Sequence, residues 1–372
     1  MNWFMDFFGE LFKYIVALEW KQVVMWIVGG VLIYLAINKE MEPTLLLPMG
    51  FGAILVNLPF SGAIGEHGPL TTLFNAGISN ELFPLLLFIG IGAMIDFGPL
   101  LSNPKLMFFG AAAQFGIFFT MFLASFCFEM KDAASIGIIG AADGPTAIVV
   151  SQALESNFIP AIMVAAYSYM ALVPIIQPPV IKMLTTKKER QIRMPYEPKE
   201  VTKLTRILFP IVITIIAGLV APDSVALVGF LMFGNLIREC GVLNSISDTA
   251  QNVLANLITI FLGITIASQM TAEKFLVPST LLIILLGLFA FVFDTAGGVL
   301  FAKAINLFSK KKINPMIGAA GISAFPMSAR VIHKMGLEED PGNFLLMHTI
   351  GVNVSGQIAS VIAGGLILNM FG

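Results

Sequence analysis

Asp143 is the residue of this chain best placed to do chemistry, because it is a carboxylate inside a Gly-rich break in apolar sequence. The surrounding segment, 139–146, reads IGAADGPT, and its Gly144 and Pro145 interrupt a helix and free backbone carbonyls. Together with the Thr146 hydroxyl, these oxygens suit a hard cation or a proton relay. A charge at mid-membrane costs about 2.5–3.5 kcal/mol on insertion scales, so Asp143 needs a partner or a function. A structural cap at a hairpin tip is the alternative.

A second break resembles the first, because the tetrapeptide IGAA recurs 178 residues later in the segment 317–323, IGAAGIS. Asn314 precedes the proline that opens this break, Gly318 relaxes the backbone, and Ser323 offers a hydroxyl. Arg330 lies seven residues after Ser323, two helical turns along one face if Pro326 does not interrupt the helix. Its guanidinium either binds an anion with two hydrogen bonds or extends to the cytoplasmic surface, and both readings stay open.

Three more polar residues interrupt apolar stretches: Tyr169, Asn353 and Asp294. Tyr169 is a candidate for proton transfer, although a lone tyrosine in a span more often packs or lies at the interface. Asn353 is a candidate cation ligand, and hydrogen bonding between helices is its alternative. Asp294 is another mid-span carboxylate whose role is open.

Composition places the chain among membrane proteins that cross the bilayer several times. It has 372 residues, of which 57% are hydrophobic and 12% charged, with a mean hydropathy of +0.88. The net charge of −2 says nothing about nucleic acid, but the sequence has no basic patch with interleaved aromatic residues, so no nucleic-acid partner is expected. Cys127 and Cys240 make neither a disulfide framework nor a metal site, and the three histidines lack metal-ligand spacing.

Ten apolar spans and two re-entrant hairpins are predicted. Residues 1–21 read as an amphipathic surface helix. The loop 182–206 holds eight of the chain's 21 basic residues and should therefore be cytoplasmic. The spans are 22–38, 43–59, 82–98, 104–128, 159–181, 207–221, 224–239, 252–269, 277–307 and 344–371, and the hairpins are 133–156 and 313–333.

The spans divide into two halves, residues 22–181 and 207–372, joined by the linker 182–206. Each half has five spans and one hairpin, and an odd number of spans turns the second half upside down relative to the first. The sequence therefore predicts two inverted-topology repeats, with the first hairpin entering from outside and the second from the cytoplasm. The strings FIGI at 88–91 and FLGI at 261–264 repeat in the third spans, unless chance explains this likeness.

At these positions the chain resembles the membrane β subunits of the biotin-dependent, sodium-translocating decarboxylases, which act on oxaloacetate, glutaconyl-CoA or methylmalonyl-CoA. The likeness covers nearly the whole chain. It is carried by the strings GAADGPTAI at 140–148, YSYMALVPIIQPPV at 167–180, NPMIGAAGISAFPMSAR at 314–330 and GVNVSG at 351–356.

The resemblance implies roles for particular residues. Catalytic roles would fall on Asp143, Tyr169, Ser323 and Arg330, with Arg330 also binding carboxybiotin. Sodium ligands would be Asp143, Thr146, Asn314, Gly318 and Asn353. The fold would be all-α and similar to that of the elevator-type citrate/sodium symporters.

The resemblance also implies a function and partners. The chain would decarboxylate carboxybiotin presented by a partner subunit and couple this step to sodium export across the bacterial cytoplasmic membrane. Its partners would be a carboxyltransferase α subunit, a biotin carrier γ subunit, a small membrane anchor subunit and further β subunits. A sodium-coupled carboxylate transporter on the same fold, without chemistry, is the alternative. The acid that feeds the complex, the sodium stoichiometry and the number of β subunits are not specified by the sequence.

Overall fold

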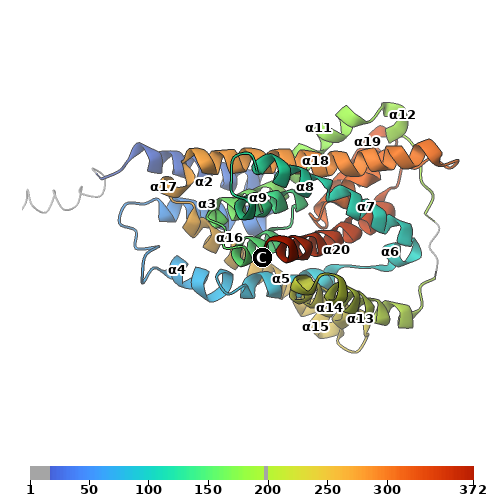
Figure 1. Cartoon of the computed structure of the whole chain (residues 1–372), viewed down its shortest axis with the longest axis horizontal. Coiled ribbons are helices and arrows are strands. Elements are labelled where there is room, and N and C mark those ends of the chain that lie inside the picture. Colours follow the sequence, from blue (N-terminus) through green and yellow to red (C-terminus); the bar gives the residue numbers. More distant parts are fainter. Residues whose placement is uncertain (1–16, 197–199) are drawn as a thin grey trace, which may run out of the picture. The chain divides into compact units, whose positions relative to one another are not determined.

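A computed structural model of the chain describes residues 17–196 and 200–372, and these form helices joined by loops (Figure 1). The all-α class predicted from the sequence is confirmed for this part of the chain. The surface helix predicted for residues 1–21 falls mostly outside the described residues and stays a prediction.

Seven described helical segments are long and apolar enough to cross a membrane, and a pair bent by 62° makes an eighth. The ten predicted spans are all helical, but two of them are shorter than the length of about 20 residues that crossing needs. These two are α3 (Pro43–Val56) and α14 (Val225–Glu239), with 14 and 15 residues. The bent pair is Pro69–Ile78 with Leu82–Met94, so the predicted span 82–98 is only part of a broken segment.

The chain forms two compact units, and each draws on both halves of the sequence. Of the described residues, the first unit contains those from 17 to 83 and from 257 to 282, and the second contains those from 84 to 256 and from 283 to 372. Three helices run across these boundaries: α5 (Leu82–Met94), α16 (Ala255–Ile266) and α18 (Pro278–Phe308).

In the first unit, α2 (Trp20–Asn38) packs closely against α3. A Cβ on Gly29 would lie 2.6 Å from the carbonyl oxygen of Gly50, so glycine permits this approach. Asn57, at the end of α3, is buried and donates to Met270 O (2.8 Å) while accepting from Ala272 N (2.8 Å). The other elements of this unit are α4 (Pro69–Leu73), η1 (Phe74–Ile78), η6 (Ala267–Gln269) and α17 (Ala272–Phe275).

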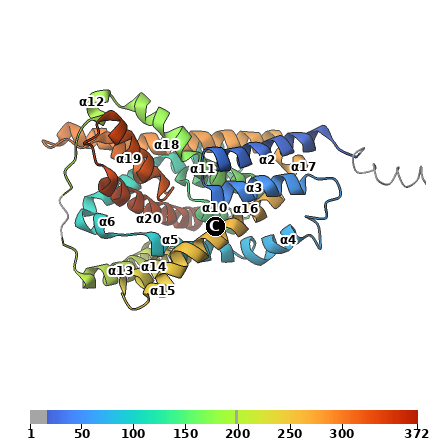
Figure 2. The ribbon, with the colours of Figure 1, turned by 180° about the vertical axis from the view of Figure 1, so that it is seen from behind.

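In the second unit, the mostly buried helix α20 (Leu346–Phe371) packs against several other elements. They include α7 (Met107–Ala113), α19 (Met327–Glu339) and the 3-10 helix η7 (Pro315–Gly321). Figure 2 shows α19 and α20 side by side. The first predicted hairpin forms α9 (Met130–Gly137), the 3-10 helix η3 (Ile138–Ala141) and α10 (Gly144–Ala153). Both IGAA segments thus contribute to 3-10 helices.

The remaining helices of the second unit frame these hairpins. α7 is followed by α8 (Phe115–Ala124) after a break at Gln114, and α11 (Ile159–Leu184) follows the first hairpin. α13 (Lys203–Val220) packs on α14 and exposes large apolar side chains along its length, as a lipid-facing helix does. The shorter elements are α6 (Gly98–Ser102), η2 (Pro104–Leu106), α12 (Lys187–Arg190), η4 (Pro222–Ser224), α15 (Asn244–Asp248) and η5 (Thr249–Leu254).

Residues of the linker 182–206 make hydrogen bonds and ion pairs with α19 and with the start of η7. Arg190 pairs with Glu339 at 2.6 Å, and Arg193 makes two hydrogen bonds to Asp340, at 2.6 and 2.8 Å. The amide of Asn314 donates to the carbonyl oxygens of Arg190 (2.7 Å) and Ile192 (3.0 Å). The linker thus contacts the end of α19 through its arginine side chains and the start of the second hairpin through its main chain.

Candidate functional site

Asp143 lies at the start of α10, where local sequence places it. It is the N-cap residue, and its side chain accepts from the backbone N–H of Thr146 at 3.4 Å. Proline in the first turn suits this position because its missing N–H would have no helical partner there. Ala142 precedes it with φ of 52°, in the left-handed region, and this residue turns the chain from η3 into α10.

The carboxylate of Asp143 is 3% exposed and collects hydrogen bonds from three separate parts of the chain. Its Oδ2 accepts from the Thr146 hydroxyl at 2.7 Å and from the Ser323 hydroxyl, in the second hairpin, at 3.3 Å. From α20, the Ser360 hydroxyl donates at 2.9 Å and the Gln357 amide at 3.1 Å. The carboxylate therefore joins both hairpins to α20, and we call Asp143, Thr146, Ser323, Gln357 and Ser360 the carboxylate cluster.

The two hairpins also meet through their main chains. The backbone N–H of Ser323 donates to the carbonyl oxygen of Ala141 at 3.0 Å. Ser360 links the same region again, since its hydroxyl lies 2.9 Å from that of Ser323. The two breaks predicted from the sequence thus come together at one buried place.

Gln357 and Ser360 were missed by the sequence reasoning. Together with Asn353 they follow the spacing i, i+4, i+7, so all three share one face of α20. Asn353 donates to the carbonyl oxygens of Ala320 (3.1 Å) and Ile322 (2.7 Å), and its Oδ1 has no partner among the described residues. Polar residues one and two helical turns after Asn353 are the sequence pattern that would have identified them.

Two of the predicted sodium ligands lie away from the carboxylate cluster. Asn314 caps η7, where its Oδ1 accepts from Met316 N at 3.1 Å and its amide holds the linker. Gly318 packs against α18, where a Cβ would lie 2.0 Å from the carbonyl oxygen of Gly298. The contacts of these two residues are those of positions that shape the second hairpin.

The predicted Tyr169 donates its hydroxyl to the carbonyl oxygen of Ile284 in α18, and it makes no hydrogen bond to the carboxylate cluster. Both tyrosines of α11 lie near the first hairpin. A Cβ on Gly144 would lie 2.4 Å from the Tyr167 ring, and a Cβ on Gly287 would meet both the Tyr169 ring (2.8 Å) and Ile139 (3.0 Å). The Tyr167 hydroxyl is buried and has no hydrogen-bond partner among the described residues, and its ring packs on the residue that follows Asp143.

Arg330 lies in a different environment. α19 begins only at Met327, after Pro326, so the condition for a shared helical face is not met and Ser323 and Arg330 do not lie on one helix. Arg330 is exposed, and no carboxylate in the described part of the chain pairs with it.

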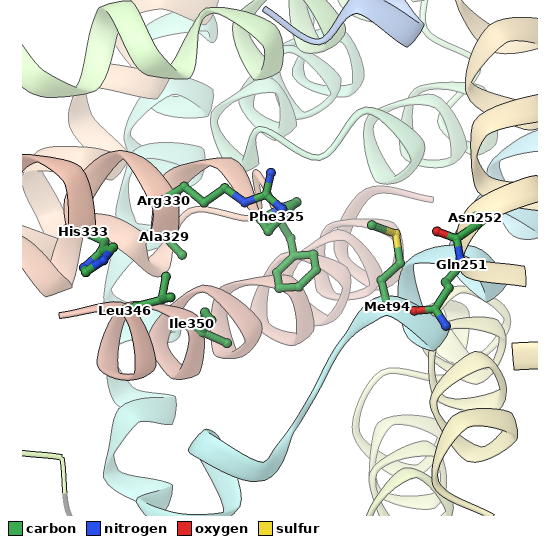
Figure 3. A pocket seen from close by; sticks show the side chains of 10 residues that line it. Met94, Gln251, Asn252, Phe325, Ala329, Arg330, His333, Leu346 and Ile350 are labelled. Atoms are coloured by element: carbon green, nitrogen blue, oxygen red, sulfur yellow. The ribbon is translucent and has the colours of Figure 1, made fainter. Parts of the chain in front are cut away.

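The Arg330 side chain lines a cavity of about 460 Å³ in the second unit, which we call the Arg330 pocket. Figure 3 shows its guanidinium reaching over Phe325, with the amides of Gln251 and Asn252 across the cavity. His333 lines the same pocket from the next turn of α19. An unpaired guanidinium with neutral polar groups around it is suited to a small organic anion.

The carboxylate cluster is suited to a cation. Hydroxyl groups both donate and accept, so Thr146, Ser323 and Ser360 can turn their oxygens toward an ion bound at Asp143. Rotating the Gln357 amide presents its Oε1 in the same way. One carboxylate among neutral oxygens balances one positive charge, which fits a monovalent ion or a proton. The second unit thus contains one group of residues suited to a cation and one suited to an anion.

Comparison with known proteins identifies a family whose description names both an ion and a carboxylate. Residues 21–371 match the model of the family described as Na+-transporting oxaloacetate decarboxylase beta subunit. The chain is 49% identical to the methylmalonyl-CoA decarboxylase subunit beta of Propionigenium modestum, over 99% of each chain. It is also 49% identical to the glutaconyl-CoA decarboxylase subunit beta of Acidaminococcus fermentans, over 96% of this chain and 95% of the relative. Identity to the probable oxaloacetate decarboxylase beta chain of Vibrio cholerae serotype O1 is 46%, over 94% and 95%.

Proposed function

The chain belongs to the family of Na+-transporting oxaloacetate decarboxylase β subunits, and we propose that it decarboxylates carboxybiotin and couples this step to sodium export. Its resemblance to this family is confirmed, and it is a multi-pass membrane subunit of a sodium-pumping decarboxylase. The observation that carries the proposal is the buried Asp143 carboxylate, held at once by both hairpins and by α20.

The names of the relatives support carboxybiotin as the common substrate. The three relatives are named for three different acids, yet each shares at least 46% of its residues with this chain. A membrane subunit that acted on the acid itself would need a different pocket for each acid. One shared intermediate, with the carboxyl group already on biotin, removes that need.

We assign the Arg330 pocket to the carboxylated biotin. An exposed guanidinium without an ion-pair partner is available to the carboxylate of a ligand carried by another subunit. Decarboxylation breaks the N–C bond of carboxybiotin, releases CO₂ and leaves the electron pair on the ureido nitrogen. That nitrogen then takes up one proton, so each turnover consumes one proton.

We assign the carboxylate cluster to sodium and to that proton. A bound sodium ion favours the ionised form of Asp143, so sodium and a proton compete for the same carboxylate. The Ser323 hydroxyl, which bonds to both Asp143 and Ser360, is placed to pass the proton on. Tyr169 stays a candidate of the family resemblance, and Tyr167, whose ring packs on Gly144, is a second candidate. Thr146 and Asn353 are further candidate ligands. Asn314 and Gly318 stay candidates of the resemblance, and their contacts also support a role in shaping the second hairpin.

The proposal is tested with two variants in the complete decarboxylase complex. Asp143→Asn should abolish sodium-dependent decarboxylation, because it removes the charge that binds the cation, but it should leave the soluble carboxyl transfer to biotin intact. Arg330→Ala should lose decarboxylation and keep sodium protection against protease, and Arg330→Lys should rescue only partly because lysine lacks the planar fork. Full sodium-stimulated turnover in Asp143→Asn would refute the assignment.

A sodium-coupled carboxylate transporter would use the same two sites without chemistry. Membership of the decarboxylase family favours the enzyme. We infer a complex with a carboxyltransferase α subunit, a biotin carrier γ subunit, a small membrane anchor subunit and further β subunits, in a bacterial cytoplasmic membrane. Release of CO₂ from free carboxybiotin by the purified complex distinguishes the two functions, since a transporter would leave it intact.

We further propose two inverted repeats, 22–181 and 207–372, that work as in an elevator-type transporter. The formation of 3-10 helices by both IGAA segments supports the repeat. The test is labelling with a membrane-impermeant thiol reagent after Cys127 and Cys240 are replaced by serine. A Lys131→Cys variant should react from outside intact cells, and a Lys311→Cys variant only from the cytoplasm. Labelling from the same side would contradict the inverted arrangement.

A further inference from the structure

Asp294 is a second buried carboxylate in the second unit, and the mechanism proposed above does not use it. It lies in the middle of α18, is 1% exposed, and sits within a segment long and apolar enough to cross a membrane. Neither of its carboxylate oxygens has a hydrogen-bond partner among the described residues, and no lysine or arginine of that part pairs with it. An unpaired charge at this depth is expensive, so something must neutralise it.

Two glycines bring the backbone of other elements against this carboxylate. A Cβ on Gly116, in the first turn of α8, would lie 2.3 Å from Asp294 Oδ1. A Cβ on Gly140, in η3 of the first hairpin, would lie 2.8 Å from Oδ2. Asp294 therefore touches the first hairpin three residues before Asp143, and glycine at both positions makes room for its oxygens.

Buried oxygens without partners occur on the two helices that meet at Asp294. Thr295, its neighbour in α18, and Thr120, one turn after Gly116 in α8, are fully buried and their hydroxyls have no hydrogen-bond partner among the described residues. A Cβ on Gly116 that meets the carboxylate would also lie 2.6 Å from the carbonyl oxygen of Ala290, and carboxylate and carbonyl oxygens are ligands that hard cations take.

We propose that Asp294 is the carboxylate of a second monovalent-cation site, separate from the carboxylate cluster and in contact with the same hairpin. The bound cation, sodium or a proton, supplies the single positive charge that no side chain supplies. Because the site touches η3, its occupancy acts on the hairpin that carries Asp143. This inference stands on the geometry of Asp294 alone and does not depend on the role given to Arg330.

The rival explanation is a structural cap. The backbone N–H groups of Gly116 and Ile117 face the carboxylate at the start of α8, although neither meets hydrogen-bond geometry. A permanently ionised Asp294 would then serve only to stabilise the first turn of α8. Asparagine caps helices about as well as aspartate, so Asp294→Asn keeps a cap and removes only the cation-binding charge.

The first measurement is chemical and does not need activity. Dicyclohexylcarbodiimide is added to the purified complex in sodium chloride or in choline chloride, and modified carboxyls are located by peptide mass spectrometry. We expect modification at Asp294, because this reagent attacks protonated carboxyls in apolar surroundings. Slower modification in sodium chloride identifies sodium as the ligand, and equal rates identify a proton. Asp132 is the matched control, because it is also buried but accepts hydrogen bonds from Ser156 (2.7 Å) and Asn157 (2.9 and 3.2 Å), and it should stay unmodified.

The second measurement uses Asp294→Asn in proteoliposomes. Losing an outer partner of a metal ligand alone costs 10–100-fold in affinity, so losing the carboxylate of a sodium site should raise the half-activating sodium concentration at least about tenfold. If the ligand is a proton, the variant should instead lower the number of sodium ions moved per carboxyl group released. The proposal is overturned if Asp294 is unmodified in both salts but modified after denaturation at the same pH. It is equally overturned if Asp294→Asn leaves both sodium activation and the transport ratio unchanged.

Discussion

Removal of the Ser360 hydroxyl should weaken sodium binding at Asp143 by a predictable amount. In the structure this hydroxyl donates to Asp143 Oδ2 at 2.9 Å and lies 2.9 Å from the Ser323 hydroxyl, all within a buried site. A hydrogen bond to a charged group contributes about 1.5–3 kcal/mol, and each 1.4 kcal/mol corresponds to a factor of about ten. Ser360→Ala should therefore raise the half-activating sodium concentration about tenfold to a hundredfold.

The measurement is the rate of decarboxylation by the purified complex as sodium is varied at constant ionic strength. Ser355→Ala is the matched control, since Ser355 is also a buried serine of α20. Its hydroxyl hydrogen-bonds only to the carbonyl oxygens of Leu106 (3.0 Å) and Val352 (2.6 Å). We expect the control to keep the wild-type sodium dependence. An unchanged curve for Ser360→Ala, or equal shifts in both variants, would show that the hydroxyl serves packing of α20 and not the ion.

Two further predictions concern a tyrosine pair and the linker. Tyr167→Phe should slow sodium-dependent turnover at least about tenfold, because it removes the unpartnered hydroxyl that we assign to the carboxylate cluster. Tyr169→Phe should mainly lower the free energy of unfolding, by about 0.5–1.5 kcal/mol, because it removes the hydrogen bond to α18. A larger loss of turnover in Tyr169→Phe than in Tyr167→Phe would instead assign the role to Tyr169. Asp340→Asn should speed cleavage of the linker by trypsin at neutral pH, because it removes the negative charge and one of the two oxygens that accept hydrogen bonds from Arg193. Those bonds lower the pKa of Asp340 below its usual value of 3.8, so their stabilisation is present above that value and is lost only as the pH falls through the lower one. Wild-type cleavage, corrected for trypsin activity, should therefore be equal at pH 6 and pH 8, and a rise at pH 6 would contradict the reasoning.

The sequence predicted the places of two breaks in regular α-helix, now seen as the 3-10 helices η3 and η7, because glycine and proline in apolar sequence favour an unusual backbone. It also named Asp143, Thr146 and Ser323, which the structure brings together. Gln357 was not found, because a glutamine or serine inside a helix of small residues is equally compatible with helix packing.

Other contacts could not be read from residue types. The Asn314 amide donates to carbonyl oxygens of the linker. Every residue has a main-chain carbonyl, so residue types cannot show which carbonyl accepts the hydrogen bond. The choice between Tyr167 and Tyr169 depends on the rotation of α11 about its axis, which its apolar pattern does not fix because most of its residues are apolar on every side. The predicted span 43–59 is longer than α3 for a similar reason, since apolar residues continue through the turn that follows Val56.

Every donor to the Asp143 carboxylate belongs to the second compact unit, and this has a thermodynamic consequence for pumping. A site that travels whole binds sodium with the same affinity whichever side of the membrane it faces. A ligand with equal affinity for two states cannot shift the balance between them, however tightly it binds. Sodium alone would then equilibrate across the membrane, and the direction of transport must come from a difference that is present on one side only. In the mechanism that we propose, loss of a carboxyl group at Arg330 would be an event of that kind, because the anion that enters the pocket would not be the species that leaves it.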